Sequence, residues 1–122
     1  MDTHKGFEQQ MSEEMIRCIE ECQACHNICL ESVQHCLSLG GEHAEPEHIR
    51  LLLDCAEICQ TSANFMLRMS DFHSRTCSVC AEICERCAED CEKFTDDSMM
   101  QQCANICRSC AASCREMASG HA

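Results

Sequence analysis

The sequence predicts an all-α fold: an up-down-up-down antiparallel four-helix bundle with a Cys-lined core, in a single domain of residues 1–122. Cysteines recur at alternating steps of three and four residues, which is the a/d spacing of a heptad that faces a bundle interior. The few helix-breaking residues divide the chain into segments of helical length, and the short connections favour antiparallel neighbours. No stretch rich in β-branched residues alternates with period two, so no sheet is expected.

The first two helices are separated by a pair of glycines. The first helix is expected over residues 8–39, because Gly40 and Gly41 follow it and favour a helix end. The second helix is expected over residues 46–69. Pro46 suits its first turn, where the missing N–H would have had no partner in the helix.

The last two helices are expected to begin at polar residues that can cap a first turn. Ser70 and Asp71 can act as an N-cap pair for a third helix over residues 71–94. The Thr-Asp-Asp-Ser cluster at residues 95–98 can do the same for a fourth helix over residues 98–118.

The composition leaves cysteine as the main core residue. The chain contains 16 Cys, 8 Met and 7 His but no Trp or Tyr, and its net charge is −12. Leu, Ile, Val and Phe make up only about 16% of the chain, which with this charge would otherwise favour disorder. Free cysteine packs as a small hydrophobic residue. The heptad spacing therefore favours a folded chain in which Cys, Ala and Met form the core.

The cysteine spacing also predicts how the helices align. In an antiparallel pair of helices, the residue numbers of two residues at the same level add up to a constant, and half of that sum is the middle of the connecting turn. The sums that bring the cysteines to the same levels place all three turn midpoints on the helix breakers. The predicted layers are Cys18/Met66/Cys77/Cys114, Cys22/Ser62/Cys80/Cys110, Cys25/Cys59/Cys84/Cys107 and Cys29/Cys55/Cys87/Cys103. Cys36 and Cys91 extend this column toward Gly40. All 16 cysteines are thus candidate metal ligands.

The sequence also indicates a compartment and excludes some functions. The N-terminus has no apolar stretch behind a basic start, and no apolar run reaches the roughly 18 residues of a membrane helix. We therefore expect a cytoplasmic protein with reduced thiols and no membrane contact. The acidic charge disfavours nucleic acid as a partner. No Ser-His-Asp constellation, phosphate loop or convergent carboxylate pair suggests catalysis, so an enzyme is not expected.

Inward thiols in this number favour Cu(I) as the bound ion. Cu(I) is soft, prefers thiolate and thioether ligands, and accepts low coordination numbers. Side chains at i and i+4 of a helix have Cβ atoms about 5–6 Å apart, so their sulfurs can flank one ion. Buried thiolates need a countercharge. One monovalent ion per thiolate supplies it, so we expect multiple Cu(I) ions, on the order of one per cysteine.

Further soft ligands are expected at one end of the column. The same register brings methionines and histidines together beyond Cys18, and such a cap of thioethers and imidazoles suggests where metal enters the bundle. The residues of this predicted uptake end are Met11, Met15, Met66, Met69, His73, Met117 and His121.

Several motifs along the chain are distinctive in combination. They are Cys18-x3-Cys22-x2-Cys25-x3-Cys29, Glu31-Ser32-Val33-Gln34-His35, Cys55-Ala56-Glu57-Ile58-Cys59, the run from Cys77 to Cys91, and the run from Cys103 to Cys114. Over about residues 12–118 the chain resembles the bacterial copper storage proteins, most closely their signal-less cytosolic branch. The resemblance implies Cu(I) storage inside the bundle, uptake at an end lined by soft ligands, and assembly into homotetramers. Copper chaperones and copper-requiring enzymes are then candidate partners.

Two other interpretations stay open. A zinc or mixed-metal thiolate buffer would use the same cysteines, although Zn(II) with four thiolates per ion would leave excess negative charge. A thiol-redox protein would need an exposed cysteine of low pKa near a base. Cys36, beside His35, is the nearest candidate for that role.

Overall fold

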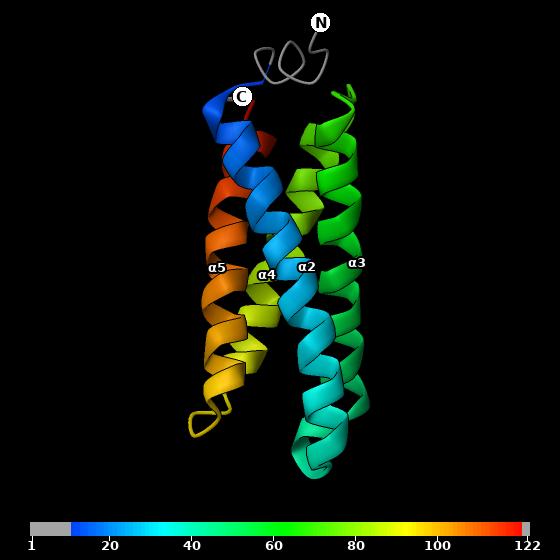
Figure 1. The fold of residues 1–122 in the computed structure, drawn as a ribbon, viewed down its shortest axis with the longest axis vertical. Coiled ribbons are helices and arrows are strands. Elements are labelled where there is room, and N and C mark those ends of the chain that lie inside the picture. Colours follow the sequence, from blue (N-terminus) through cyan, green and yellow to red (C-terminus); the bar gives the residue numbers. More distant parts are fainter. Residues whose placement is uncertain (1–10, 121–122) are drawn as a thin grey trace, which may run out of the picture.

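The computed structural model describes residues 11–120, which form a four-helix bundle (Figure 1). The helices are α2 (Glu13–Leu39), α3 (Pro46–Leu67), α4 (His73–Glu92) and α5 (Ser98–Ala118), and a short 3-10 helix, η1 (Gly41–Ala44), joins the first two. Each helix packs against the next, and α2 packs against α5 to close the ring. Residues 11–120 contain no strand, so the predicted fold class is confirmed. Within the same residues, no helix is long and apolar enough to cross a membrane.

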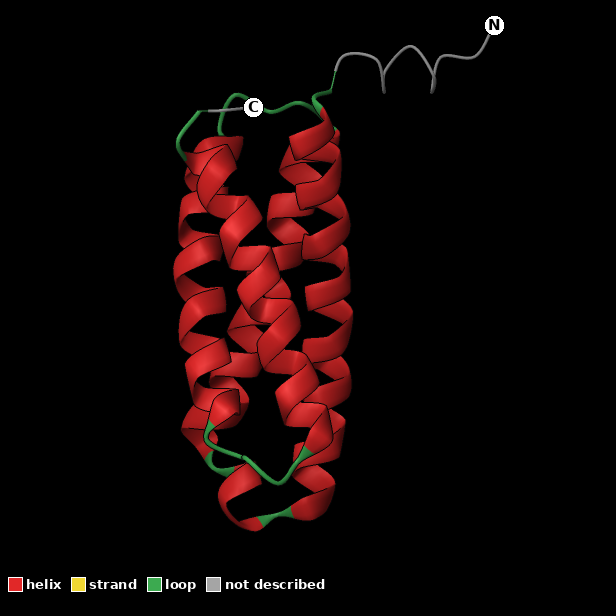
Figure 2. Ribbon diagram, turned by 90° about the vertical axis from the view of Figure 1, so that its left-hand side faces the viewer, coloured by secondary structure: helices red, strands yellow, loops and turns green. Residues whose placement is uncertain are grey.

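The connections lie at the two ends of an elongated molecule (Figure 2). The α3–α4 turn lies at the end where the described chain begins and finishes, whereas η1 and the α4–α5 loop lie at the opposite end. The first is called the methionine end here and is defined by Met11, Met15, Met66, Met69, His73 and Met117. The second is called the histidine end and is defined by His35, Cys36, His43, His48 and Met100.

Helix α2 begins at Glu13 because Ser12 caps it. The Ser12 hydroxyl accepts a hydrogen bond from the Met15 N–H at 3.0 Å, which satisfies one of the first-turn donors that a helix leaves free. Met11 and Ser12 are not helical, so this start differs from the predicted one. The predicted helical residues 8–10 lie outside the described part of the chain.

The turn between α3 and α4 is longer than predicted. Helix α3 ends at Leu67, and Met69 has a positive φ of 56°. The Ser70 hydroxyl accepts a hydrogen bond from the Phe72 N–H at 3.1 Å, so this residue stabilises a local turn instead of capping a helix. Helix α4 therefore begins at His73, two residues after the predicted start near residue 71.

Cysteine, alanine and methionine form most of the core. All 16 cysteines are at most 1% exposed. Of the Leu, Ile, Val and Phe residues in the described chain, only Ile19, Ile28 and Leu52 are buried, while Leu37 and Leu39 are each 55% exposed. Large apolar side chains usually occupy bundle interiors. Here most of them are partly buried at the edge of the core or exposed, and cysteine and methionine occupy most of the interior positions.

Candidate metal centre

The cysteines form one column of free thiols along the bundle axis. None of the 16 is in a disulfide. Neighbouring Sγ atoms on different helices approach to 3.6 Å, as between Cys25 and Cys107 and between Cys59 and Cys84. Thiolates bind a metal at a sulfur–metal distance of about 2.3 Å. Sulfur atoms this close can therefore share one ion after small side-chain movements.

The predicted register between α2 and α5 agrees with the structure. All four predicted Sγ pairs are in contact: Cys18–Cys114, Cys22–Cys110 and Cys25–Cys107 at 3.6 Å, and Cys29–Cys103 at 4.0 Å. Contacts between adjacent levels join Cys22 to Cys114 at 3.6 Å and Cys29 to Cys107 at 3.9 Å. Met66 also meets its predicted partner, because its Sδ lies 3.8 Å from the Cys77 Sγ. The heptad spacing thus fixes these levels correctly.

Helix α3 departs from the predicted flat layers. Cys55 lies within 4.8 Å of its predicted neighbour Cys29, but its Sγ also lies 3.7 Å from the Sγ of Cys25 and 3.7 Å from that of Cys84. Cys59 keeps its predicted partner Cys84 but also lies 3.6 Å from Cys80. Side chains of packed helices interdigitate, so the α3 thiols sit between the levels of their neighbours. The layers therefore overlap instead of stacking as separate discs.

The overlap produces an unbroken series of four-thiol sets. In each set all four Sγ atoms lie within 4.8 Å of one another. Five of these sets, in order along the column, are Cys22/Cys80/Cys110/Cys114, Cys59/Cys80/Cys84/Cys110, Cys25/Cys55/Cys59/Cys84, Cys25/Cys29/Cys55/Cys107 and Cys29/Cys87/Cys103/Cys107. Each set shares two thiols with the next. A shared thiolate can bridge two ions, so the arrangement favours a continuous metal–thiolate cluster.

The thiols nearest the histidine end are held in the protonated form. Burial, together with the charges of Asp97, Cys103 and Asp90, raises the pKa of Cys36 to about 11. The neighbouring thiol of Cys103 and burial also raise the pKa of Cys91. Metal ions bind thiolates, so loading this part of the column must release protons.

The methionine end brings together most of the predicted uptake residues. Met15, Met66 and Met117 are at most 4% exposed and close the thiol column. Met69 is 38% exposed. His73 is half-buried, and its Nδ1 lies 2.9 Å from the Ser70 carbonyl oxygen. Met11 packs on the core from outside, and His121 lies outside the described residues.

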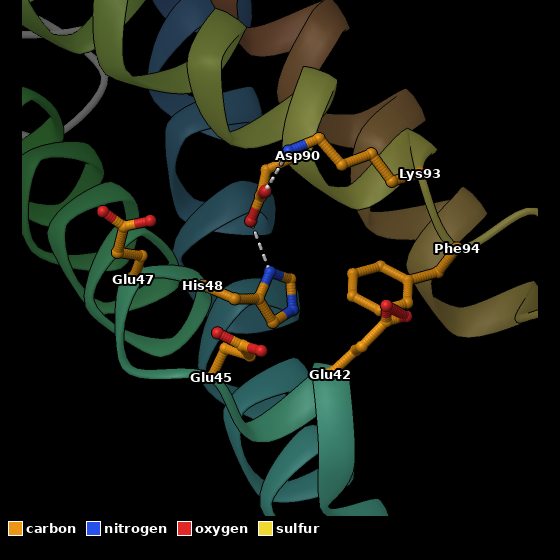
Figure 3. Close-up of a pocket in the computed structure, with 7 residues that line it drawn as sticks. All are labelled: Glu42, Glu45, Glu47, His48, Asp90, Lys93 and Phe94. Atoms are coloured by element: carbon orange, nitrogen blue, oxygen red, sulfur yellow. Dashed lines mark hydrogen bonds and ion pairs between the residues drawn. The ribbon is translucent and has the colours of Figure 1, made fainter.

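The histidine end contains two side chains that could bind a metal ion and that the cysteine pattern did not predict, His48 and Met100. The His48 side chain is buried, its Nε2 lies 3.3 Å from the Cys36 Sγ, and its Nδ1 lies 2.5 Å from an Asp90 carboxylate oxygen. Figure 3 shows this imidazole between Asp90 and the ring of Phe94. The Met100 Sδ lies 3.6 Å from the same Cys36 sulfur. Cys36 therefore faces one nitrogen and one sulfur donor, and the imidazole is oriented by a carboxylate.

A signal for His48 was present in the sequence. The constant sum that pairs Cys29 with Cys55 also pairs Cys36 with His48. The register could therefore have been continued by one level beyond the cysteines. Met100 follows from the same rule, because the sum that pairs Cys77 with Cys114 also pairs Cys91 with Met100.

Overlapping thiol sets inside a helical ring, with nitrogen and thioether donors at the ends, define a metal-binding bundle of the thiolate-cluster class. The chain belongs to the copper storage protein family, whose family model matches residues 11–119. The resemblance inferred from the cysteine motifs is thereby confirmed.

Individual relatives agree with this assignment. The Nmul_A1745 protein of Nitrosospira multiformis is 47% identical, with a TM-score of 0.85 over 89% of this chain and 98% of that one. The Cu(I)-bound copper storage protein BsCsp3 of Bacillus subtilis is 37% identical, with a TM-score of 0.81 over 87% of this chain and 99% of that one. The cysteine-rich protein YhjQ of Bacillus subtilis is 39% identical over 66 residues. This match covers 54% of the chain and 61% of YhjQ, which is less than two thirds of that relative.

Proposed function

We propose that the protein stores Cu(I) in the thiol column, with all 16 cysteines as ligands and a capacity on the order of one ion per cysteine. The observation that carries the proposal is the series of four-thiol sets in which each set shares two thiols with the next, from Cys22 and Cys114 to Cys87 and Cys103. Separate sites would hold one ion for every four thiols, whereas bridging thiolates let the capacity follow the number of sulfurs. The similarity to BsCsp3, which was solved with Cu(I) bound, supports the same ion.

Charge favours Cu(I) over Zn(II) in this core. A buried thiolate is tolerated only when a cation neutralises it. One Cu(I) per thiolate neutralises the column completely, whereas Zn(II) bound by four thiolates carries two excess negative charges at each site. Neighbouring zinc sites of this kind would repel one another in the dry interior. A zinc buffer is therefore the weaker candidate.

We propose the methionine end as the place of copper uptake. Thioethers are soft ligands without charge, so they can bind Cu(I) and pass it on without taking up or releasing a proton. Met66 lies next to Cys77, at the last level of the thiol column. An ion held by Met15, Met66 or Met117 would be in reach of these thiols. Met11, Met69 and His73 complete the proposed path at the outer surface, and His121, which is proposed for the same path, lies outside the described residues.

We propose that the protein works in the cytoplasm as a store and not as an enzyme. Its free thiols suit a reducing compartment. Copper chaperones or copper-requiring enzymes would then exchange ions with it. Assembly into a homotetramer is consistent with leucines exposed on the outside of α2 and α3, among them Leu30, Leu37 and Leu53.

An anaerobic titration tests the storage function directly. Reduced apo-protein is titrated with Cu(I) in the presence of a chromogenic Cu(I) chelator, and bound copper and thiols are counted afterwards. We expect the protein to retain copper up to roughly one ion per thiol before the chelator responds. Retention of only one or two ions would refute the storage proposal. The matched titration with Zn(II) should saturate near one ion per four thiols.

A further inference from the structure

Three polar side chains from separate elements meet on the outside of the histidine end. His35 lies in the last turns of α2, His43 lies in η1, and Asp97 is the N-cap residue of α5. The Nε2 atoms of His35 and His43 lie 2.7 Å and 2.9 Å from the same oxygen, Asp97 Oδ2. Both ring nitrogens therefore lie next to the same carboxylate oxygen.

The surroundings hold these groups in place. Asp97 Oδ1 accepts hydrogen bonds from the N–H groups of Met99 at 2.9 Å and Met100 at 3.1 Å, which leaves Oδ2 for the imidazoles. The His43 ring packs on Phe94 with the ring centroids 4.2 Å apart. The histidine side chains are 30% and 23% exposed and the Asp97 side chain is 14% exposed. The cluster is thus preorganised and still reached by water.

We propose that His35, His43 and Asp97 bind one divalent transition-metal ion of the Zn(II) class. Two imidazoles and one carboxylate are a common ligand set for such ions, with the remaining positions filled by water. At zinc–ligand bonds of about 2.0–2.1 Å, tetrahedral geometry places the ligand atoms about 3.3 Å apart. Each imidazole nitrogen would therefore need to move away from Asp97 Oδ2 by only about half an ångström for an ion to replace the N–H hydrogen between them.

Electrostatics favour a cation at this place. Burial opposes ionisation of Asp97, but hydrogen bonds from the imidazoles and from a backbone N–H outweigh it and hold its pKa at about 2. The carboxylate is therefore charged throughout the physiological range. Glu42 and Asp96 line the same open hollow and add negative charge. Lys93 also lines the hollow, but its amine lies 3.2 Å from an Asp90 carboxylate oxygen.

The site differs from the copper column in position and in chemistry. Cys36, the next residue in sequence, is completely buried in the core, whereas His35 is partly exposed on the outside. Cu(I) prefers sulfur, while imidazole and carboxylate suit ions of intermediate softness such as Zn(II). An ion bound here would tie the end of α2, η1 and the start of α5 together. The ion bound by His35, His43 and Asp97 would then cross-link these three elements beside the last level of the thiol column.

Zinc binding by the copper-loaded protein tests this proposal, because copper occupies the competing thiols. Protein saturated with Cu(I) is titrated anaerobically with Zn(II) against a chromogenic zinc indicator. We expect one Zn(II) per chain, with affinity reduced by more than about 100-fold in the His35→Ala/His43→Ala variant, since even outer-shell changes cost 10–100-fold. The His26→Ala variant, which alters a histidine on α2 whose Nδ1 lies 2.8 Å from the Ala56 carbonyl oxygen, should bind Zn(II) normally.

Co(II) in place of Zn(II) identifies the ligands. Visible d–d bands without a sulfur-to-cobalt charge-transfer band are expected, whereas such a band would place the ion on cysteine and overturn the proposal. Failure of the copper-loaded wild type to bind Zn(II), or equal binding by the double variant, would also overturn it. Circular dichroism and copper content confirm folding, and the single His43→Ala variant replaces the double variant if the latter is unfolded. If the protein does not load copper, the same zinc titration is done on the apo-protein. The number of Zn(II) ions bound by the wild type should then exceed the number bound by the variant by one.

Discussion

The two ends of the bundle close the same thiol column with different chemistry. At the methionine end, the buried thioethers of Met15, Met66 and Met117 carry no charge and no exchangeable proton. At the histidine end, His48 bridges Cys36 and Asp90. The first end presents soft and conformationally adaptable ligands, whereas the second holds its donors through hydrogen bonds to carboxylates.

With copper uptake at the methionine end, as proposed, this difference would separate two tasks of a metal store. Copper that moves into the column needs ligands that bind weakly, release readily and require no proton transfer, which thioethers provide. Copper that stays at the far level is better served by a donor whose position and tautomer are fixed. The following predictions can strengthen or break this distinction.

The largest effect is expected from filling the column between the two ends. Each site occupied at 1,000 times its dissociation constant adds about 4 kcal/mol of stability, and 1 kcal/mol shifts the unfolding midpoint of a domain of this size by about 4 °C. Full loading should therefore raise the unfolding temperature by at least about 20 °C. Anaerobic calorimetry of apo- and copper-loaded protein measures this rise. Equal unfolding temperatures would mean that copper does not bind in the core.

The second effect concerns the rate of uptake. Changing Met15, Met66 and Met117 together to Leu removes the thioethers but conserves volume, so the fold should tolerate it. We expect Cu(I) uptake, followed by stopped-flow absorbance, to slow by roughly tenfold or more, which corresponds to about 1.4 kcal/mol in the barrier. The final copper content should be nearly unchanged.

The matched control for uptake is Met100→Leu at the histidine end. Met100 is as buried as Met66 and also contacts a cysteine sulfur, but it lies at the far end of the column. The Met100→Leu variant should therefore take up Cu(I) at the wild-type rate. If Met100→Leu slows uptake and the triple variant does not, copper enters at the histidine end.

The comparison of the ends also shows what the sequence could and could not predict. The α2–α5 pairs were predictable because heptad spacing places residues at whole levels. The offset of Cys55 toward Cys25 was not, because it is a fraction of one level and depends on how side chains interdigitate. Asp97 lies in the predicted cap of the fourth helix, but its meeting with His43 was not predictable because the path of a loop leaves no periodic signal. The start of α4 was missed because Ser70 satisfies a turn instead of a helix.

A third effect is expected in copper capacity. His48→Gln removes the imidazole beside Cys36, so the protein should lose about one equivalent of Cu(I), the one bound at the histidine end. Cys25→Ser in the middle of the column should also lose about one equivalent without unfolding the bundle. The control His73→Gln, at the methionine end, should keep full capacity. Loss of all copper in the His48 variant would show that the column is one cooperative cluster without a distinct end site.

The smallest effect concerns stability in acid and should be confined to the histidine end. The folded state lowers the pKa of Asp97 from 3.8 to about 2, so ionisation of this carboxyl favours folding. Its contribution is complete above about pH 4 and is lost as the pH falls through about 2. Asn keeps the N-cap but carries no charge, so Asp97→Asn should cost the apo-protein about 1–2 kcal/mol near neutral pH and less in acid. Urea unfolding at several pH values measures this difference.

Asp71→Asn, in the turn at the methionine end, is the matched control. An equal loss of stability in that variant would mean that the hydrogen bonds of the Asp97 carboxylate contribute nothing specific to the histidine end.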